Sequence, residues 1–142
     1  MLREILVGAS VSLSNITIHA LSMTVVIWGA RVAGAARTSH PVIRLILVMS
    51  ATVSFLMAAH VAEVLVWALA YAIVGAAPEG ADLVYFAFVN YATLGYGDVT
   101  PVKEWLLLGP MTAMNGVLLY GWSTAVIYDV LRRAMAAERG EE

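Results

Sequence analysis

Three long segments with almost no charge constrain this chain more than any other feature. They run from Ile5 to Ala30, from Leu45 to about Gly75, and from Trp105 to Tyr128, and only His60 and Glu63 interrupt the second. A helix needs about 20 residues to cross a hydrocarbon core about 30 Å thick, and each segment is long enough. We therefore expect an all-α membrane protein with three transmembrane helices.

The overall composition excludes several other classes of protein. The chain is 61% hydrophobic and 13% charged, which is too apolar for a soluble domain of 142 residues. A net charge of −2 gives no footprint for nucleic acid, and the lack of cysteine excludes disulfides and thiolate metal sites. The first segment could be a signal peptide, because small residues follow it at 33–36. It is too long and too rich in Ser, Thr, Asn and His for that class, so we expect an uncleaved span.

The lysine and arginine residues predict the orientation in the membrane. Six of them lie on one side of the membrane and two on the other. The first side holds Arg31, Arg37, Arg44, Arg132, Arg133 and Arg139, and the second holds Arg3 and Lys103. Cytoplasmic segments carry the excess of positive charge. We therefore expect the C-terminus in the cytoplasm, and the N-terminus and the segment 76–104 outside, in the plasma (inner) membrane of a cell.

The segment between the second and third spans is unlike an ordinary loop. Asp82 is a suitable N-cap for a short apolar and aromatic helix from Leu83 to about Ala92, and a glycine-rich stretch follows it and ends at Pro101. A helix of about ten residues is too short to cross a bilayer. We expect it to enter the membrane from outside and return.

The glycine-rich stretch contains the sequence TLGYGD at Thr93–Asp98. This motif resembles the selectivity filter of the potassium channel family, which commonly reads TVGYGD. The resemblance extends to an outer helix, a pore helix, a proline three residues after Asp98 and an inner helix, so the chain is similar to a small prokaryotic channel with an additional N-terminal span. It implies a homotetramer in which each chain has three identical partners in the bilayer. It also implies passive conduction of K⁺ ions held in the filter, with no organic cofactor and no enzymatic activity.

The resemblance also assigns roles around the filter. The backbone carbonyls and the first hydroxyl would bind K⁺, and the residues of this strand are Thr93, Leu94, Gly95, Tyr96 and Gly97. Tyr96 would pack on aromatic residues of the pore helix such as Tyr85. Val89 stands where some members place a carboxylate behind the filter, so we expect Asp98 to lack that partner.

The third span has candidate hinge and pore-lining residues. Gly116 and Gly121 lie 18 and 23 residues after Asp98, near the hinge region of the family, and close helix packing is the alternative explanation. The pore-lining residues would then be Val117, Tyr120 and Thr124, and Pro110 should kink the helix.

Polar residues are expected to meet near the middle of the membrane. At about 1.5 Å per residue, Asn15, Glu63 and Asn115 fall at one depth, and His19 and His60 fall about one turn deeper. Three interpretations stay open: a hydrogen-bond network that docks the first helix, a proton sensor, and a zinc site formed by His19, His60 and Glu63.

The resulting organisation has three parts. They are an additional helix with a basic loop (1–44), a pore domain (45–133) and a cytoplasmic tail (134–142), and the pore domain divides into an outer helix (45–75), pore helix (82–92), filter (93–98) and inner helix (104–131). The main hypothesis is a potassium-selective channel. The alternatives are a poorly selective cation channel and a proton- or metal-sensing membrane protein with a pore loop that does not conduct.

Overall fold

The computed structural model describes residues 1–35 and 40–139, and within these residues the fold is entirely helical. Arg37, which contributed to the charge count, and the end of the tail at 140–142 lie outside the described residues. The helices are α1 (Leu2–Ala35), α2 (Pro41–Val74), α3 (Leu83–Tyr91) and α4 (Leu108–Arg139), with a 3₁₀ turn at Lys103–Trp105.

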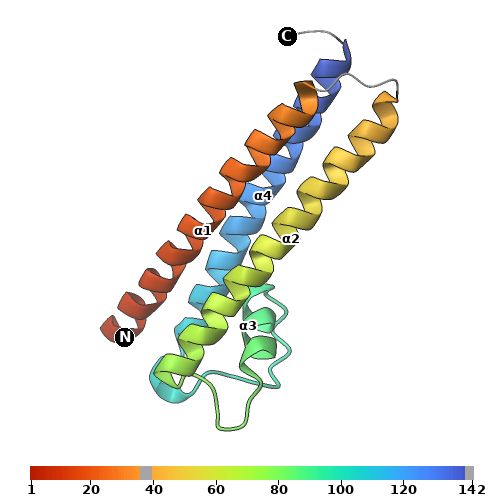
Figure 1. Cartoon of the computed structure of the whole chain (residues 1–142). Coiled ribbons are helices and arrows are strands. Elements are labelled where there is room, and N and C mark those ends of the chain that lie inside the picture. The colour runs from red at the N-terminus through yellow and green to blue at the C-terminus, as the bar shows by residue number, and fades with distance from the viewer. Residues whose placement is uncertain (36–39, 140–142) are drawn as a thin grey trace.

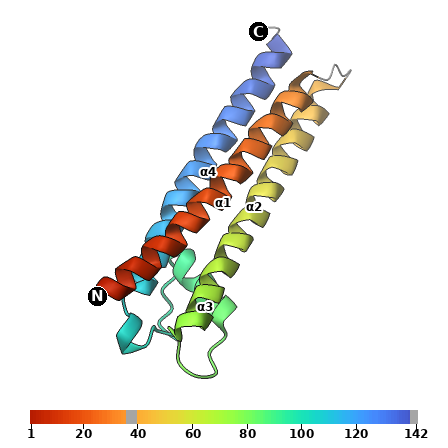
Figure 2. The ribbon, with the colours of Figure 1, turned by 60° about the vertical axis from the view of Figure 1, so that its left-hand side comes forward.

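The three long helices run side by side, and α3 lies at one end of the bundle (Figure 1). A view turned by 60° shows the same arrangement (Figure 2). The start of α1 and the α3 region share one end of the bundle, while the C-terminus lies at the other. α1 packs against both α2 and α4, and α3 packs against the same two helices.

Two helices of the described part are long and apolar enough to cross a membrane. They are Leu2–Val32 within α1 and the whole of α2, Pro41–Val74. The expected third span, α4, is not among them. Its sequence includes Asn115, three glycines and several hydroxyl side chains, and these residues lower the hydropathy of a helix that is otherwise long enough.

Several predicted helix boundaries were wrong. α2 begins at Pro41 instead of Leu45, because proline suits the first turn of a helix, where its missing N–H is not needed. The other end of α2 agrees with the prediction, because the helix ends at Val74 and its cap is Gly75, whose φ of 67° is accessible to glycine at little cost. α4 begins at Leu108 instead of 104 and continues beyond 131, so part of the predicted tail is helical. Pro110 therefore lies in the first turn of α4, where the N–H that proline lacks would have no partner in the helix. The kink that we expected at Pro110 has no physical cause there.

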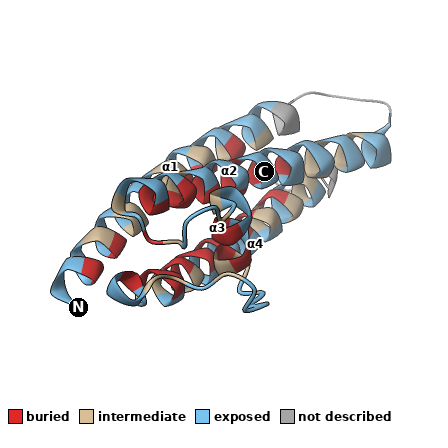
Figure 3. Cartoon of the chain, turned by 90° about the horizontal axis from the view of Figure 1, so that it is seen from below, coloured by how far each residue is buried: buried red, intermediate tan, exposed pale blue. Residues whose placement is uncertain are grey.

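Two apolar cores hold the helices together. The first joins α2, α3 and the start of α4 and contains large buried rings: Trp67, Tyr71, Phe86, Tyr91 and Trp105. The second joins α1, α2 and the end of α4 through Met23, Val26, Leu56, Val126 and Val130. Seen from the α3 end, the buried residues lie on the inner faces of the helices and the exposed residues lie outside (Figure 3).

The start of α1 is also attached to the start of α4. The Leu107 backbone N–H donates to Glu4 Oε2 at 2.9 Å, and the Arg3 guanidinium lies 4.5 Å from the centre of the Trp105 ring. These contacts fix the axial register of α1 against α4, and that register sets the height of the polar residues farther along α1.

Candidate functional site: the filter loop and the buried polar cluster

The short helix α3 is capped as its sequence predicts. Asp82 Oδ1 accepts hydrogen bonds of 3.0 Å from the backbone N–H groups of Val84 and Tyr85, which have no partner inside the helix. The other end leads directly into the glycine-rich loop. There the Thr93 N–H donates to the Asn90 carbonyl at 3.0 Å, and the Leu94 N–H donates to the Val89 carbonyl at 2.9 Å. The end of α3 therefore positions the first residues of the loop.

The loop backbone alternates in handedness. Thr93, Gly95 and Gly97 have φ values of 59°, 60° and 78°, and the residues between them do not have positive φ. Glycine adopts this conformation readily, but a β-branched threonine does so at a cost of about 1–3 kcal/mol. Reversing the handedness at every second residue turns successive carbonyl groups toward one side of the chain. Positive φ at Gly95 and Gly97 is the backbone conformation that the filter hypothesis predicts for these two glycines.

The loop is not covered by the rest of its own chain. Residues 93–98 are all exposed, including 53% of Leu94 and 65% of Tyr96. Within the described residues, Tyr96 makes no ring contact with the aromatic residues of α3, so the packing that we expected for it does not form inside one chain. Large exposed apolar side chains on such a loop are typical of a surface that another molecule covers.

Asp98 has a partner that the sequence did not reveal. Val89 is buried and makes no bond to it, but the Tyr85 hydroxyl donates to Asp98 Oδ2 at 2.6 Å. This hydrogen bond holds the pKa of Asp98 below its usual value. Tyr85 therefore contacts the loop through a hydrogen bond to Asp98 instead of by packing against Tyr96.

The two candidate hinge glycines of α4 have different surroundings. A Cβ atom at Gly116 would lie 2.1 Å from the backbone oxygen of Tyr91, whereas a Cβ atom at Gly121 would meet none of the described residues within 4 Å. Gly116 therefore allows α4 to approach the end of α3, which is the close-packing explanation. The three candidate pore-lining residues are exposed: Val117, Tyr120 and Thr124.

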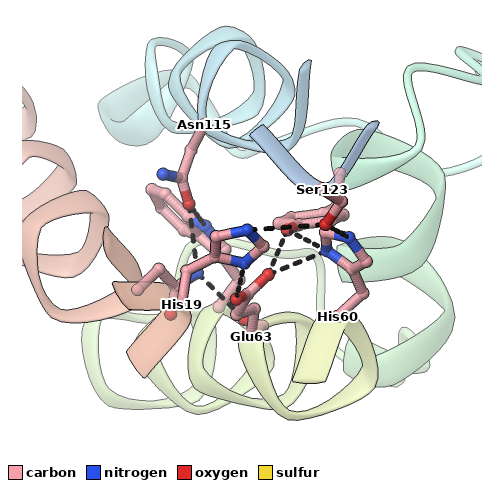
Figure 4. Close-up of polar contacts among 8 residues, drawn as sticks. His19, His60, Glu63, Asn115 and Ser123 are labelled. Carbon is pink, nitrogen blue, oxygen red and sulfur yellow. Dashed lines mark hydrogen bonds and ion pairs between the residues drawn. The ribbon is translucent and has the colours of Figure 1, made fainter. Parts of the chain in front are cut away.

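The polar residues expected near mid-membrane do lie together, between the two apolar cores (Figure 4). Asn15 Nδ2 lies 3.1 Å from both the backbone oxygen of Glu63 and Oδ1 of Asn115. The Trp67 indole N–H also donates to Asn115 Oδ1, at 3.0 Å. These bonds connect α1, α2 and α4 at a single level.

Glu63 is the centre of the deeper part of the cluster. His19 Nδ1 lies 2.8 Å from one carboxylate oxygen, and His60 Nδ1 lies 2.9 Å from the other. The Tyr91 hydroxyl donates to the second oxygen at 2.5 Å. The Glu63 and His19 side chains are completely buried, and the carboxylate is bonded from α1, α2 and α3.

Two members of the cluster, Ser123 and Tyr91, were not among the polar residues predicted from the sequence. Ser123 Oγ lies 2.9 Å from His60 Nε2 and 3.4 Å from His19 Nε2, so it bridges the two imidazoles. Tyr91 joins the cluster to the end of α3. Ser123 lies eight residues after Asn115, about two helical turns, and that spacing was the available signal.

The same residues were a candidate zinc site. Ligand atoms of His19, His60 and Glu63 all lie within 4.8 Å of one another, so these residue types are near enough to share an ion. However, the nitrogen atoms facing the carboxylate are 2.8 and 2.9 Å from it, which is hydrogen-bonding distance. Two ligands of a tetrahedral zinc ion are roughly 3.3 Å apart when each is about 2.0–2.1 Å from the metal. The geometry is that of a hydrogen-bonded network.

The fold and the site together define a helical membrane protein in which a short helix and a glycine-rich loop are held between two long helices. Residues 42–133 match the model of a family described as an ion channel. This match covers most of the chain, and the protein therefore belongs to that ion channel family and serves ion transport in a membrane. No curated protein and no solved structure gives a match. The matched span begins in α2 and ends in α4, so α1 lies outside it.

Proposed function

We propose that this protein is a potassium-selective channel in which four copies of the chain surround one pore. The observation that carries the proposal is the alternating backbone of the loop, with positive φ at Thr93, Gly95 and Gly97. Four such strands with their carbonyls turned toward a common axis would replace the water around a dehydrated cation. K⁺ would then move passively down its electrochemical gradient.

The exposed loop supports a fourfold assembly with three identical partners. One chain supplies one strand, and a ring of carbonyl oxygens needs several strands arranged around a closed symmetry axis. The exposed side chains of Leu94 and Tyr96 would be covered by neighbouring subunits. The end of α3 would direct the negative end of its dipole toward the cavity below the filter, which favours a cation there.

In this assembly α4 is the third span and lines the pore. A helix that faces water on one side does not need to be apolar on all sides, which accounts for its lower hydropathy. Val117, Tyr120 and Thr124 would lie on the pore side. The charge distribution supports an orientation with the N-terminus outside and the C-terminus in the cytoplasm. The membrane would be the plasma (inner) membrane.

The test is ion flux in liposomes that contain the purified protein. We expect uptake of rubidium or potassium that barium blocks, and little uptake of sodium. The matched pair of variants is Gly95→Ala and Gly29→Ala. Gly95 has a φ of 60°, where alanine is strained, and Gly29 lies on an open helix surface with nothing within 4 Å of an added Cβ. G95A should lose the flux, and G29A should keep it.

Each other outcome would favour one alternative. Equal sodium and potassium flux would make the protein a poorly selective cation channel. Liposomes that stay tight to both ions, with correctly assembled protein, would refute conduction and favour a sensing protein whose pore loop is closed. Equal flux through G95A and wild-type protein would show that the alternating backbone is not the conducting element.

A further inference from the structure

Six side chains surround the buried carboxylate of Glu63 or its histidine partners. The titratable ones are His19 from α1, His60 from α2, Tyr91 from α3 and Tyr120 from α4, whose ring centre is 4.7 Å from that of His60. The others are Ser123 and Trp122, and the ring centre of Trp122 is 5.2 Å from that of His19. Among the described residues, no lysine, arginine or second carboxylate makes an ion pair with the cluster.

The hydrogen bonds of this cluster can be counted. An ionised carboxylate only accepts, so both Nδ1 atoms that face Glu63 must carry hydrogens. If both imidazoles are neutral, both Nε2 atoms need a donor. In the described part of the chain, the group that reaches both of them is the Ser123 hydroxyl, which has a single hydrogen. One buried nitrogen would then stay without a partner, and the cluster would have a net charge of −1.

One additional proton removes both problems. With one imidazole charged, its Nε2–H donates to Ser123 Oγ, and the Ser123 hydroxyl donates to Nε2 of the other imidazole. Every donor then has an acceptor, and the positive charge balances Glu63. A second additional proton would leave the Ser123 hydrogen without an acceptor and give a net charge of +1. Unbalanced charge and unpaired polar groups are both costly inside a membrane.

We propose that Glu63, His19, His60 and Ser123 form a proton-binding site that holds one exchangeable proton shared between the two imidazoles. The proton has a route to the outside of the bundle. A groove of about 200 Å³ between α2 and α4 reaches His60 and Ser123, and Tyr120 and Thr124 also line it. His60 is 8% exposed whereas His19 is fully buried, so His60 is the imidazole that exchanges the proton.

The proton count can be measured by NMR on protein labelled with ¹⁵N-histidine in lipid bilayers. The His40→Gln change leaves only His19 and His60 to observe, because the chain has three histidines. Near neutral pH we expect one additional proton per chain, shared between the two imidazoles through Ser123. Two neutral or two charged imidazoles at neutral pH would overturn the proposal.

Two variants test the roles of the individual groups. Glu63→Gln removes the balancing charge, so the signal of a protonated imidazole at neutral pH should be lost. Ser123→Ala should confine the proton to one imidazole, while Ser123→Thr keeps the hydroxyl and should restore the shared proton. Ser14→Ala, which removes a hydroxyl from the exposed face of α1, is the control and should change nothing. Identical titrations in wild-type protein, E63Q and S123A would refute the site.

A zinc ion is the competing occupant of this site, and adding zinc to the labelled protein tests that alternative. We expect the histidine signals to be unaffected by one equivalent of zinc per chain. Stoichiometric zinc binding that releases the proton would overturn the proposal in favour of a metal site. These measurements do not require conduction, so they decide the proton site even if the liposomes prove tight.

Discussion

The contact between α4 and the end of α3 predicts opposite effects for two similar substitutions. Gly116→Ala places a Cβ atom 2.1 Å from the backbone oxygen of Tyr91 and 3.0 Å from its carbonyl carbon. Real Cβ atoms are essentially never closer than 3.0 Å to such a neighbour, so the two helices must separate by about 0.9 Å (3.0 minus 2.1) or more. Gly121→Ala meets nothing within 4 Å.

The magnitude follows from comparing the two variants. Replacing glycine by alanine in a helix gains about 1 kcal/mol in each case, so this gain cancels in the difference. Overpacking against atoms that cannot move freely costs about 1–3 kcal/mol, and a clash with backbone belongs at the upper end. We therefore expect G116A to be less stable than G121A by about 3 kcal/mol, roughly a 100-fold change in the unfolding equilibrium.

The assay is denaturation of the purified protein in detergent, followed by tryptophan fluorescence, because Trp67 and Trp105 are buried in the core that the clash disturbs. G116A should also lose ion flux, since Tyr91 lies two residues before Thr93. Equal stability of G116A and G121A would refute the reasoning. Lower flux in both variants without a difference in stability would indicate instead that both glycines act as hinges.

Other predictions follow from single hydrogen bonds. Asp82→Ala should destabilise the fold by about 1 kcal/mol through loss of the α3 cap, measured by the same denaturation. Asn115→Ala should cost about 1–3 kcal/mol, because two buried donors lose their acceptor. Tyr85→Phe removes the hydrogen bond that holds the pKa of Asp98 below its usual value, so the loss of flux on acidification should begin at a higher pH. Glu63→Gln should make rubidium flux less dependent on pH between about 5 and 8 than in wild-type protein.

The sign and the controls of these predictions are defined by the structure. A carboxylate whose pKa is lower in the folded protein than in the unfolded chain stabilises the folded protein at pH values above the unfolded pKa. This contribution is lost as the pH falls through the pKa of the folded protein. An unchanged acid profile in Y85F would show that the bond to Asp98 has no influence on the pore. Glu79→Ala, an exposed carboxylate near the capping residue, is the control for D82A. A pH profile of E63Q identical to that of wild-type protein would separate the proton site from conduction.

The features that the sequence predicted well are those set by short-range rules. The cap at Asp82 depends on two backbone N–H groups within three residues of it. The common depth of Asn15, Glu63 and Asn115 follows from the rise of a helix and from the direction of each span. Positive φ at Gly95 and Gly97 could also be expected, because glycine adopts this conformation readily and the residue type alone indicates it.

The features that the sequence did not predict depend on helix rotation and on the path of the loop. Ser123 is one of several hydroxyl residues in α4, and only the rotation of that helix about its axis turns Ser123 toward the two histidines. The bond from Tyr85 to Asp98 requires the loop to return alongside α3, which no local pattern encodes. Likewise the contact of Gly116 with the Tyr91 carbonyl appears only when α3 and α4 are packed.

The polar contacts of α1 have a consequence for the synthesis of the protein. α1 leaves the ribosome before α2 and α4, and the residues that pair with Asn15 follow 48 and 100 residues later. The hydroxyl that bridges to His19 follows 104 residues later. At about 5–20 residues per second, the asparagine waits roughly 5–20 s for its last partner. During that time α1 carries unpaired polar groups that lipid disfavours, so it should stay beside the insertion machinery until α4 arrives.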